Sequence, residues 1–366
     1  MEKDRQLKLW KAVSVISMIL LIIVGSLYII ERNKDREDIS GLPDEEISYL
    51  SLWNEDAEAR KELESYVKAV TDIGSEDYIP EDHRIAVFDL DGTLFCETDP
   101  IYFDYQLFLH RVLDDPDYEA SEFELETAAK IMEQIETGNG AKGLEVDHGK
   151  GIASSFAGMS IKAFNDYIQD FKNEDAPGYN NMKRGDAFYL PMVEVLDFLQ
   201  NSGFTVYIVS GTDRLIVRGI VDGIGFLNIP ANHIIGSDEV IISNKQGDTD
   251  GLDYVFSEDE ELILAGEFTV KNLKMNKVAV IAQEIGIQPV LSFGNSTGDS
   301  SMAEYVTGNN PYRSLAFMLC CDDTVRENGN EAKAQKMYDL CNEYGWIPIS
   351  MKNDWITIYG DEVTRK

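Results

Sequence analysis

Cysteine and histidine are both scarce in this chain of 366 residues, which holds four of each. The cysteines are Cys96, Cys320, Cys321 and Cys341, and no two of them form a CxxC pair. The histidines form no HExxH motif. Zinc sites need clustered Cys and His ligands, so these absences argue against a zinc hydrolase. The even number of cysteines leaves a disulfide open, but no spacing requires one.

Positive charge is also scarce, because 32 Lys and Arg face 66 Asp and Glu, which gives a net charge of −34. Nucleic-acid binding needs clustered Lys and Arg, so this excess argues against a nucleic-acid partner. It also argues against basic patches that dock on anionic lipid. A small phosphorylated substrate stays compatible with it, since a bound cation reverses the local field.

One long hydrophobic run is present, between Lys11 and Glu31, where 19 residues carry no charge. A helix of about 20 apolar residues crosses a bilayer. The run is long for the apolar part of a cleaved signal peptide, and no A-x-A site follows it. We therefore interpret residues 12–30 as a single-pass transmembrane signal anchor, after a flank at 1–11 and before a polar linker at 31–50. The small excess of Lys and Arg before the run favours a folded domain outside the cytoplasm.

Beyond the linker, short apolar runs alternate with helical patterns. Strands are predicted at 85–88, 205–209, 289–293 and 314–319, and helices at 101–113, 119–136, 160–172, 191–203, 214–223, 276–285 and 330–344. Residues 237–270 are typical of a β-hairpin, and Asn54 is the expected N-cap of the first helix. The alternation predicts an α/β fold with a doubly wound parallel sheet. We expect a core formed by 51–94 and 186–366, with 95–185 inserted as a helical cap.

The first motif, Asp89-Leu90-Asp91-Gly92-Thr93, follows the predicted strand at 85–88. In open α/β sheets, ligands bind at the carboxyl ends of the strands. Asp89 and Asp91 are two residues apart, so both can face one site. An Asp-Gly pair between apolar runs also signals a hairpin turn, and the motif by itself leaves both interpretations open.

Two further predicted strands end in polar residues. Ser210 and Gly211 follow 205–209, where a hydroxyl and free backbone N–H groups can hold a phosphoryl oxygen. Asn295 and Asp299 follow 289–293, in a glycine-bearing loop that suits a hard cation such as Mg²⁺. Each feature alone is typical of a surface turn. Three such strand ends in one chain favour a shared active site.

The order of these motifs, with Lys277 between the second and third, resembles the haloacid dehalogenase-like (HAD) superfamily of phosphohydrolases. It looks most similar to a phosphoserine-phosphatase-like bacterial branch, and the similarity spans about residues 50–358, including the block IGIQPVLSFGNSTGD. The resemblance implies a Rossmannoid core and a Mg²⁺-dependent phosphatase that hydrolyses small phosphomonoesters. A phosphotransferase or mutase of the same superfamily, and a non-catalytic membrane-tethered binding module, are the alternatives.

The resemblance also implies roles for single residues. Asp89 would be the nucleophile that forms an aspartyl phosphate, and Asp91 the general acid and then the base. Ser210 would bind phosphoryl oxygens, and Lys277 would neutralise charge, with Lys271 and Lys274 as the alternative lysines. Thr93, Gly211 and Asn295 would also belong to the phosphate-binding residues. Thr93 would support the loop geometry, and Asn295 would support the loop or the metal shell without ligating the metal directly. The implied Mg²⁺ ligands are Asp89, the backbone carbonyl of Asp91, and Asp299.

Substrate contacts are less well defined by the sequence. Glu97, Tyr102 and Met159 are candidate contacts from the cap, although Tyr102 and Met159 are more often core residues. Arg214 lies just beyond Ser210 and could reach a substrate anion, but an ordinary surface arginine is at least as common. Thr212 and Asp213 stand where the similar branch usually has more glycine.

Overall fold

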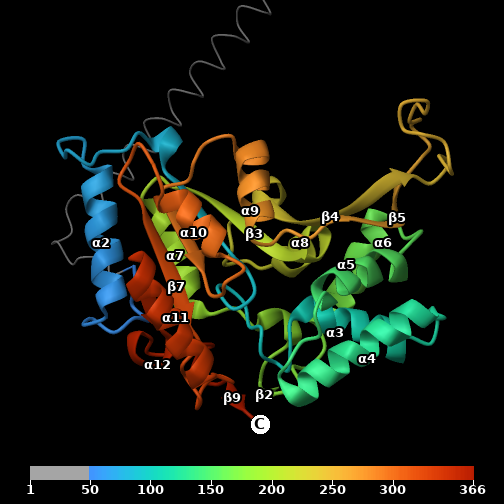
Figure 1. Ribbon diagram of the computed structural model, residues 1–366, viewed down its shortest axis with the longest axis horizontal. Coiled ribbons are helices and arrows are strands. Elements are labelled where there is room, and N and C mark those ends of the chain that lie inside the picture. The colour runs from blue at the N-terminus through green and yellow to red at the C-terminus, as the bar shows by residue number, and fades with distance from the viewer. Residues whose placement is uncertain (1–48) are drawn as a thin grey trace, which may run out of the picture. The chain divides into compact units, whose positions relative to one another are not determined.

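A seven-stranded sheet organises residues 49–366, the part of the chain that the computed structural model describes (Figure 1). Its strands are β1 (Ile85–Phe88), β3 (Thr205–Asp213), β4 (Ile234–Ser243), β5 (Leu262–Val270), β6 (Leu291–Gly294), β7 (Leu315–Cys320) and β8 (Ile347–Ser350). A separate antiparallel pair joins β2 (Tyr179–Asn180) to β9 (Thr364–Arg365).

The strand order in the large sheet is β5-β4-β3-β1-β6-β7-β8. All neighbours pair in parallel except β4 and β5, which form the antiparallel hairpin predicted over 237–270. From β1 in the middle, the chain adds β3 and β4 on one side and then β6, β7 and β8 on the other. The expectation of an α/β fold with a mostly parallel sheet is therefore confirmed, and the direction of winding switches beside β1.

Helices flank this sheet along the chain. They are α2 (Glu58–Thr71), α3 (Phe103–Leu109), α4 (Glu122–Thr137), α5 (Leu144–Ser155), α6 (Ile161–Lys172), α7 (Leu190–Asn201), α8 (Arg214–Val221), α9 (Met275–Val280), α10 (Ser300–Thr307), α11 (Glu331–Tyr344) and α12 (Met351–Asp354). Single π-helical turns continue α3 over His110–Asp114 and α9 over Ile281–Ile285.

The central strand β1 is buried on both faces, as a continuous apolar run in a parallel sheet requires. Successive side chains point to opposite faces. Val87 packs with Met302 of α10 in one cluster, whereas Phe88 belongs to the larger cluster that contains Leu196 of α7. Helices on both faces thus hold β1 rigidly, and the residues that follow it start from a fixed position.

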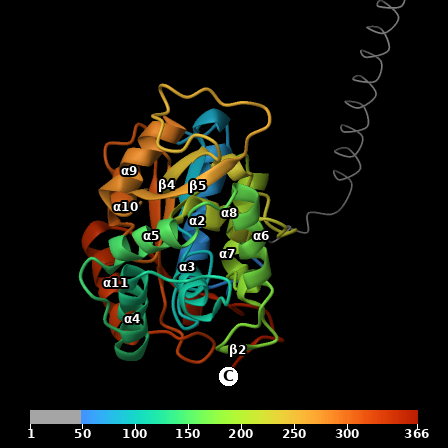
Figure 2. The same ribbon diagram turned by 90° about the vertical axis from the view of Figure 1, so that its right-hand side faces the viewer.

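The four helices α3 to α6 lie between β1 and β3 in the sequence and gather to one side of the core (Figures 1 and 2). They correspond to the helical block predicted at 95–185. Helix α5 was not among the predicted helices, because Gly149 and Gly151 lower its helical propensity. A Cβ atom on Gly149 would lie 2.6 Å from Phe268 of β5, and one on Gly151 would lie 2.7 Å from Phe108 of α3. Close packing therefore explains both glycines.

The expected start of the first helix is wrong. Helix α2 begins at Glu58 after Ala57, and the N–H of Ala57 donates to the carbonyl of Asn54 in the turn before it. The side-chain amide of Asn54 donates to the carbonyl of Asn353 and not to a helix terminus. Asn54 therefore ties the turn to the C-terminal part of the chain, a distant contact that no local pattern reveals.

The segment 12–30, predicted to span a membrane, lies outside the described residues, as do the flank at 1–11 and the linker up to residue 48. Leu50, at the end of the predicted linker, is buried in the core. Within residues 49–366, no helix has the length and apolar character needed to cross a membrane.

Candidate active site

The turn after β1 carries Asp89 and Asp91 into the sheet's carboxyl edge. The N–H of Asp89 donates to the carbonyl of Phe293 at 2.9 Å, so Asp89 is fixed against β6. Gly92 has a φ of +78°, and a Cβ there would lie 1.8 Å from the side-chain nitrogen of Asn295. Because β1 pairs in parallel on both sides, the Asp-Gly pair is a loop at a strand end and not a hairpin turn.

Lys277, fully buried on α9, joins the carboxylates of two strand ends. Its Nζ lies 2.6 Å from Oδ1 of Asp89 and 2.7 Å from Oδ1 of Asp299. Burial opposes the charge of Lys277, but the carboxylates of Asp299 and Asp89 outweigh this effect and raise its pKa. Lys271 lines the pocket at another point, and Lys274 uses its backbone N–H to hold Gly298. Of the three candidate lysines, Lys277 is the one that contacts Asp89.

The carboxyl group of Asp89 is buried beside another carboxylate. Burial, and then the charge of Asp299, raise the pKa of Asp89 to about 7, although Lys277 opposes the shift. The second oxygen of Asp299 accepts the N–H groups of Asn295 and Ser296, each at 3.1 Å. Asp299 is thereby held in place by its own loop.

Asp91 has the environment of a neutral carboxylic acid. Burial raises its pKa well above the usual range, and the charges of Asp104 and Asp89 raise it further. Its Oδ2 accepts the hydroxyl of Thr212 at 2.7 Å, whereas its Oδ1 is buried with no partner. A protonated carboxyl group with one unpartnered oxygen can donate a proton to a bound molecule.

At the end of β3, the side chain that reaches the pocket is not the one that the sequence predicted. Ser210 is fully buried, and its hydroxyl accepts the N–H of Thr212 at 3.0 Å. Gly211 and Thr212 line the pocket, but Ser210 does not appear in its lining. The strand also continues to Asp213, beyond the predicted end at 209. Thr212, seen in the sequence only as a departure from the similar branch, is the side chain that contacts Asp91.

These strand ends enclose a small cavity of about 90 Å³, which we call the catalytic pocket. Its lining consists of Asp89, Asp91, Glu97, Tyr102, Asp104, Tyr105, Glu145, Gly211, Thr212, Lys271, Leu273, Asn295, Ser296 and Asp299. The predicted residues Glu97 and Tyr102 are among them. Burial raises the pKa of Glu97 to about 7, against a hydrogen bond with Asn295. Thr93 is fully buried beneath the loop, and its hydroxyl has no partner.

Two candidate substrate contacts lie elsewhere. The guanidinium of Arg214 pairs with Asp238 at 2.7 Å and with Glu284 at 2.6 Å. The backbone of Met159 accepts the N–H of Leu264 in β5, and its side chain packs against the core. Neither Arg214 nor Met159 is in the lining of the catalytic pocket. Arg214 is therefore an ion-paired arginine and Met159 a residue packed against the core, as the alternatives left open by the sequence had it.

Sequence reasoning missed Asp104 and Glu145, which enter the catalytic pocket from the helical block. Asp104 is 2% exposed, and its Oδ1 has no hydrogen-bond partner. Its Oδ2 lies 3.7 Å from Nδ1 of the buried His148. No local motif marks these residues, because only the packing of α3 and α5 against the core brings them to the site.

The catalytic pocket offers oxygen donors that suit a hard cation. Asp89 and Asp299 already share one positive charge, the ammonium of Lys277. Between residues 49 and 366, no three Asp, Glu, His or Cys side chains are grouped as metal ligands. The oxygen atoms of the two carboxylates, Asp89 and Asp299, are ligands of the kind that Mg²⁺ prefers. The residues therefore fit a magnesium ion.

The loop after β6 also matches a second enzyme pattern. Residues 294–298 read GNSTG and so fit the GxSxG of serine hydrolases. The hydroxyl of Ser296 pairs with Asp299 at 3.3 Å, and no histidine lines the catalytic pocket. A serine nucleophile needs a neighbouring base that takes its proton, so the pocket does not support this alternative.

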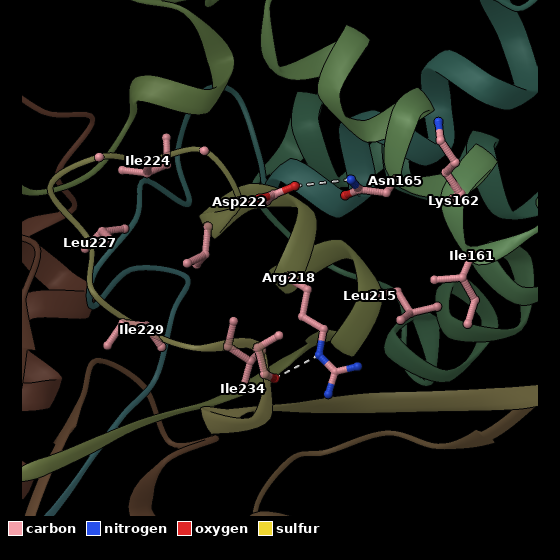
Figure 3. Close-up of a pocket in the computed structure, with 14 residues that line it drawn as sticks. Ile161, Lys162, Asn165, Leu215, Arg218, Asp222, Ile224, Leu227, Ile229 and Ile234 are labelled. Carbon is pink, nitrogen blue, oxygen red and sulfur yellow. Dashed lines mark hydrogen bonds between the residues drawn. The ribbon is translucent and has the colours of Figure 1, made fainter. Parts of the chain in front are cut away.

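A larger cavity, of about 800 Å³, is lined by none of these carboxylates, and Figure 3 shows the residues that line it. Its walls come from the start of α6, from α8 and from the following loop, and they are mostly apolar. Arg218 donates to the carbonyl of Ala231 at its edge, and Asn165 donates to Asp222. It contains no residue predicted for catalysis. The residues predicted for catalysis therefore line the smaller cavity and not this one.

An open, mostly parallel sheet with acidic side chains gathered at its strand ends has the architecture of an α/β enzyme. The family model of haloacid dehalogenase-like hydrolases matches residues 86–304, well over half of the chain. The chain therefore belongs to this family of hydrolases. Comparison with the curated proteins gives no match.

Solved structures with a similar fold share little sequence. A conserved protein of unknown function from Anaerococcus prevotii is 13% identical with a TM-score of 0.50, over 87% of this chain and all of that one. A cytosolic 5'-nucleotidase IIIB bound to cytidine is 13% identical with a TM-score of 0.47, over 81% and 89%. A phosphoserine phosphohydrolase-like protein from Francisella tularensis is 16% identical with a TM-score of 0.35, over 64% and 87%. The first of these likenesses supports the fold.

Proposed function

We propose that this hydrolase is a Mg²⁺-dependent phosphatase that acts on small phosphomonoesters through an aspartyl phosphate on Asp89. The observation that carries the proposal is the buried Lys277, whose ammonium bridges Asp89 and Asp299 beside Asp91. A carboxylate nucleophile and a cation meet there in one pocket, next to a carboxylic acid with an unpartnered oxygen.

Charge is the first obstacle to this reaction, because a phosphate dianion repels a carboxylate nucleophile. The Lys277 ammonium offsets the charge of Asp89 and of an incoming phosphoryl oxygen. A Mg²⁺ ion held by Asp89, Asp299 and the carbonyl of Asp91 supplies further positive charge when bound. Because the pKa of Asp89 is raised to about 7, the nucleophile is ionised on the alkaline side of neutrality.

Proton transfer is the task of Asp91. As an oxygen of Asp89 bonds to phosphorus, the ester P–O bond breaks and the departing oxygen takes the proton of Asp91. The resulting Asp91 carboxylate then accepts a proton from water. That water bonds to phosphorus, the bond to Asp89 breaks, and inorganic phosphate leaves. The raised pKa of Asp91 supports this role, because the acid must be protonated when the first step begins.

Binding of the phosphoryl oxygens falls to the loops around Asp89. We assign it to the backbone of Gly211, the amide of Asn295 and the hydroxyl of Ser210. Ser210 would act after its hydroxyl turns from the N–H of Thr212, which it contacts here at 3.0 Å. Thr93 supports the loop from below. The helical block α3 to α6 would act as the cap that limits water and selects the alcohol.

Release of inorganic phosphate tests the proposal. The full chain, purified in a mild detergent, is incubated with an aryl phosphate, with Mg²⁺ or with EDTA, and compared with Asp89→Asn. We expect turnover that needs Mg²⁺ and that falls at least about a thousandfold in Asp89→Asn. Turnover that survives this substitution contradicts the proposal. Transfer to an added alcohol without phosphate release would instead favour the phosphotransferase alternative.

We further propose that residues 12–30 anchor the enzyme in a membrane as a single-pass segment, with the hydrolase domain outside the cytoplasm. The support is the run of 19 uncharged residues and the larger number of Lys and Arg before it. Reporter domains that are active on one side only, fused at the C-terminus, test the orientation. Recovery of the full chain in the soluble fraction after cell lysis would contradict the anchor.

A further inference from the structure

A second cavity, of about 460 Å³, adjoins the catalytic pocket. The two cavities share the lining residues Glu97, Tyr102, Asn295 and Ser296. The catalytic pocket holds about 90 Å³, whereas pockets that enclose small organic ligands usually measure several hundred. The alcohol of a phosphate ester bound at Asp89 therefore has to extend beyond the catalytic pocket, and the second cavity, which we call the side cavity, lies next to it.

The side cavity has an apolar part and a polar part. Apolar side chains come from the segment before α3, from α4, β7 and α11, and they include Ile101, Ile135, Leu319, Met337 and Leu340. Polar side chains lie among them, namely Thr98, Gln134, Asn328, Asn330, Lys333 and Lys336. A ligand with a hydrocarbon portion and a polar group matches this lining better than a fully polar or a fully apolar one.

Two lysines give the side cavity positive charge, next to the acidic catalytic pocket. Lys333 and Lys336 lie three residues apart on α11, so both occupy the same side of the helix. Neither forms an ion pair within the described part of the chain, although acidic residues outnumber basic ones by 66 to 32. Glu97, on the shared wall, is the one carboxylate of the lining.

Lys333 also acts across the shared wall. Burial raises the pKa of Glu97, and the positive charge of Lys333 is one of the influences that oppose this rise. The ammonium of Lys333 is therefore electrostatically coupled to the edge of the catalytic pocket. By contrast, that pocket is lined by one lysine, Lys271, and by six carboxyl groups, those of Asp89, Asp91, Glu97, Asp104, Glu145 and Asp299. An anionic group other than the phosphate would be repelled there and attracted to α11.

We propose that the side cavity binds the alcohol portion of the substrate, and that Lys333 and Lys336 bind a second anionic group carried by that alcohol. The substrate class is then a phosphomonoester of an extended, partly apolar alcohol that carries another negative charge. This inference rests on the proposed phosphatase function. Both lysines are exposed to solvent, which limits the strength of each charge pair, so we expect a preference of about five- to tenfold from the two together.

The test compares two substrates, hexyl phosphate and its ω-carboxylate analogue, with three full-length enzymes. These are the wild type, the double variant Lys333→Ala/Lys336→Ala, and the control Lys68→Ala/Lys352→Ala, which removes the same charge from exposed positions elsewhere. We expect kcat/KM for the carboxylate ester to fall about five- to tenfold more than that for hexyl phosphate in the α11 variant. The control should keep the wild-type ratio.

An equal ratio in all three enzymes overturns the inference, and so does a wild type that prefers hexyl phosphate. If no ester is hydrolysed in an Asp89-dependent manner, the proposed function fails separately. Calorimetry with the two corresponding phosphonates, which cannot be hydrolysed, then measures the same ratio as binding constants. A carboxylate preference that disappears in the α11 variant would support the side cavity in either case.

Discussion

Replacing Lys277 by methionine tests the electrostatics of the catalytic pocket. Lys277 is fully buried, and its ammonium contacts Asp89 at 2.6 Å and Asp299 at 2.7 Å. Methionine has a similar length and no charge, so it leaves both carboxylates without their shared partner. Removal of one partner from a buried ion pair destabilises a protein by about 3–5 kcal/mol.

Protonation of Asp89 limits that loss. Its pKa is about 7 even with Lys277 present, so neutralising it at about pH 8 costs only about 1.4 kcal/mol, the value of one pKa unit. We therefore expect Lys277→Met to lower the free energy of unfolding by about 3 kcal/mol at about pH 8, the lower end of that range.

The sign of the pH dependence follows from the same group. The pKa of Asp89 is raised on folding from 3.8 to about 7, so the native state binds more protons between these values. Stability from this group is present at low pH and is lost as pH rises toward 7. Without Lys277 the pKa of Asp89 rises further. The deficit of Lys277→Met, meaning the free energy of unfolding that it loses relative to the wild type, should therefore be largest above pH 7. We expect it to be roughly halved at about pH 5.

Urea denaturation without Mg²⁺, at about pH 5 and pH 8, measures both values. Lys172→Met is a matched control, because the ammonium of Lys172 is also buried but donates to the backbone carbonyls of Gly219, Ile220 and Asp222. Its deficit should be similar at both pH values, since carbonyls do not titrate. Equal deficits of Lys277→Met at the two pH values, or a deficit below about 1 kcal/mol, would refute the reasoning.

Three further predictions concern single residues. Gly92→Ala should destabilise the fold by at least about 2 kcal/mol in urea denaturation, because φ is +78° and the new Cβ would lie 1.8 Å from Asn295. Asp91→Asn should lower kcat about a hundredfold or more for alkyl phosphates and much less for aryl phosphates, whose leaving groups need no acid; equal losses would contradict it. Asp104→Asn removes a charge that raises the pKa of Asp91, so the alkaline limb of the kcat/KM profile should move to lower pH.

The sequence predicts the core of this fold well because its strands are short apolar runs. Residues 85–88 form β1 as expected, and Asp89, Asp91 and Asp299 meet in one pocket because parallel strands bring their carboxyl ends to the same edge. The contact of Lys277 with Asp89 joins residues that are 188 positions apart. The order of the motifs along the chain predicted that Lys277 acts with Asp89, whereas hydrophobic periodicity gave no sign of it.

The sequence fails where tertiary packing decides. Helix α5 contains two glycines that close contacts require, and Asn54 binds a distant carbonyl instead of capping a helix. Asp104 and Glu145 reach the catalytic pocket only through the packing of the helical block. The pattern after β3 drew attention to Ser210, but the hydroxyl that contacts Asp91 belongs to Thr212, because the strand continues past its predicted end.

The central claim is that Asp89 carries the phosphoryl group, and trapping that intermediate tests it most directly. The full chain is mixed with Mg²⁺ and a phosphate ester labelled on phosphorus, quenched in acid within milliseconds, digested and mapped by mass spectrometry. We predict an acid-stable, hydroxylamine-labile phosphoryl group on the peptide that contains Asp89, and none in Asp89→Asn. Label on Ser210 or Ser296, or phosphate release with no labelled peptide, would contradict the account.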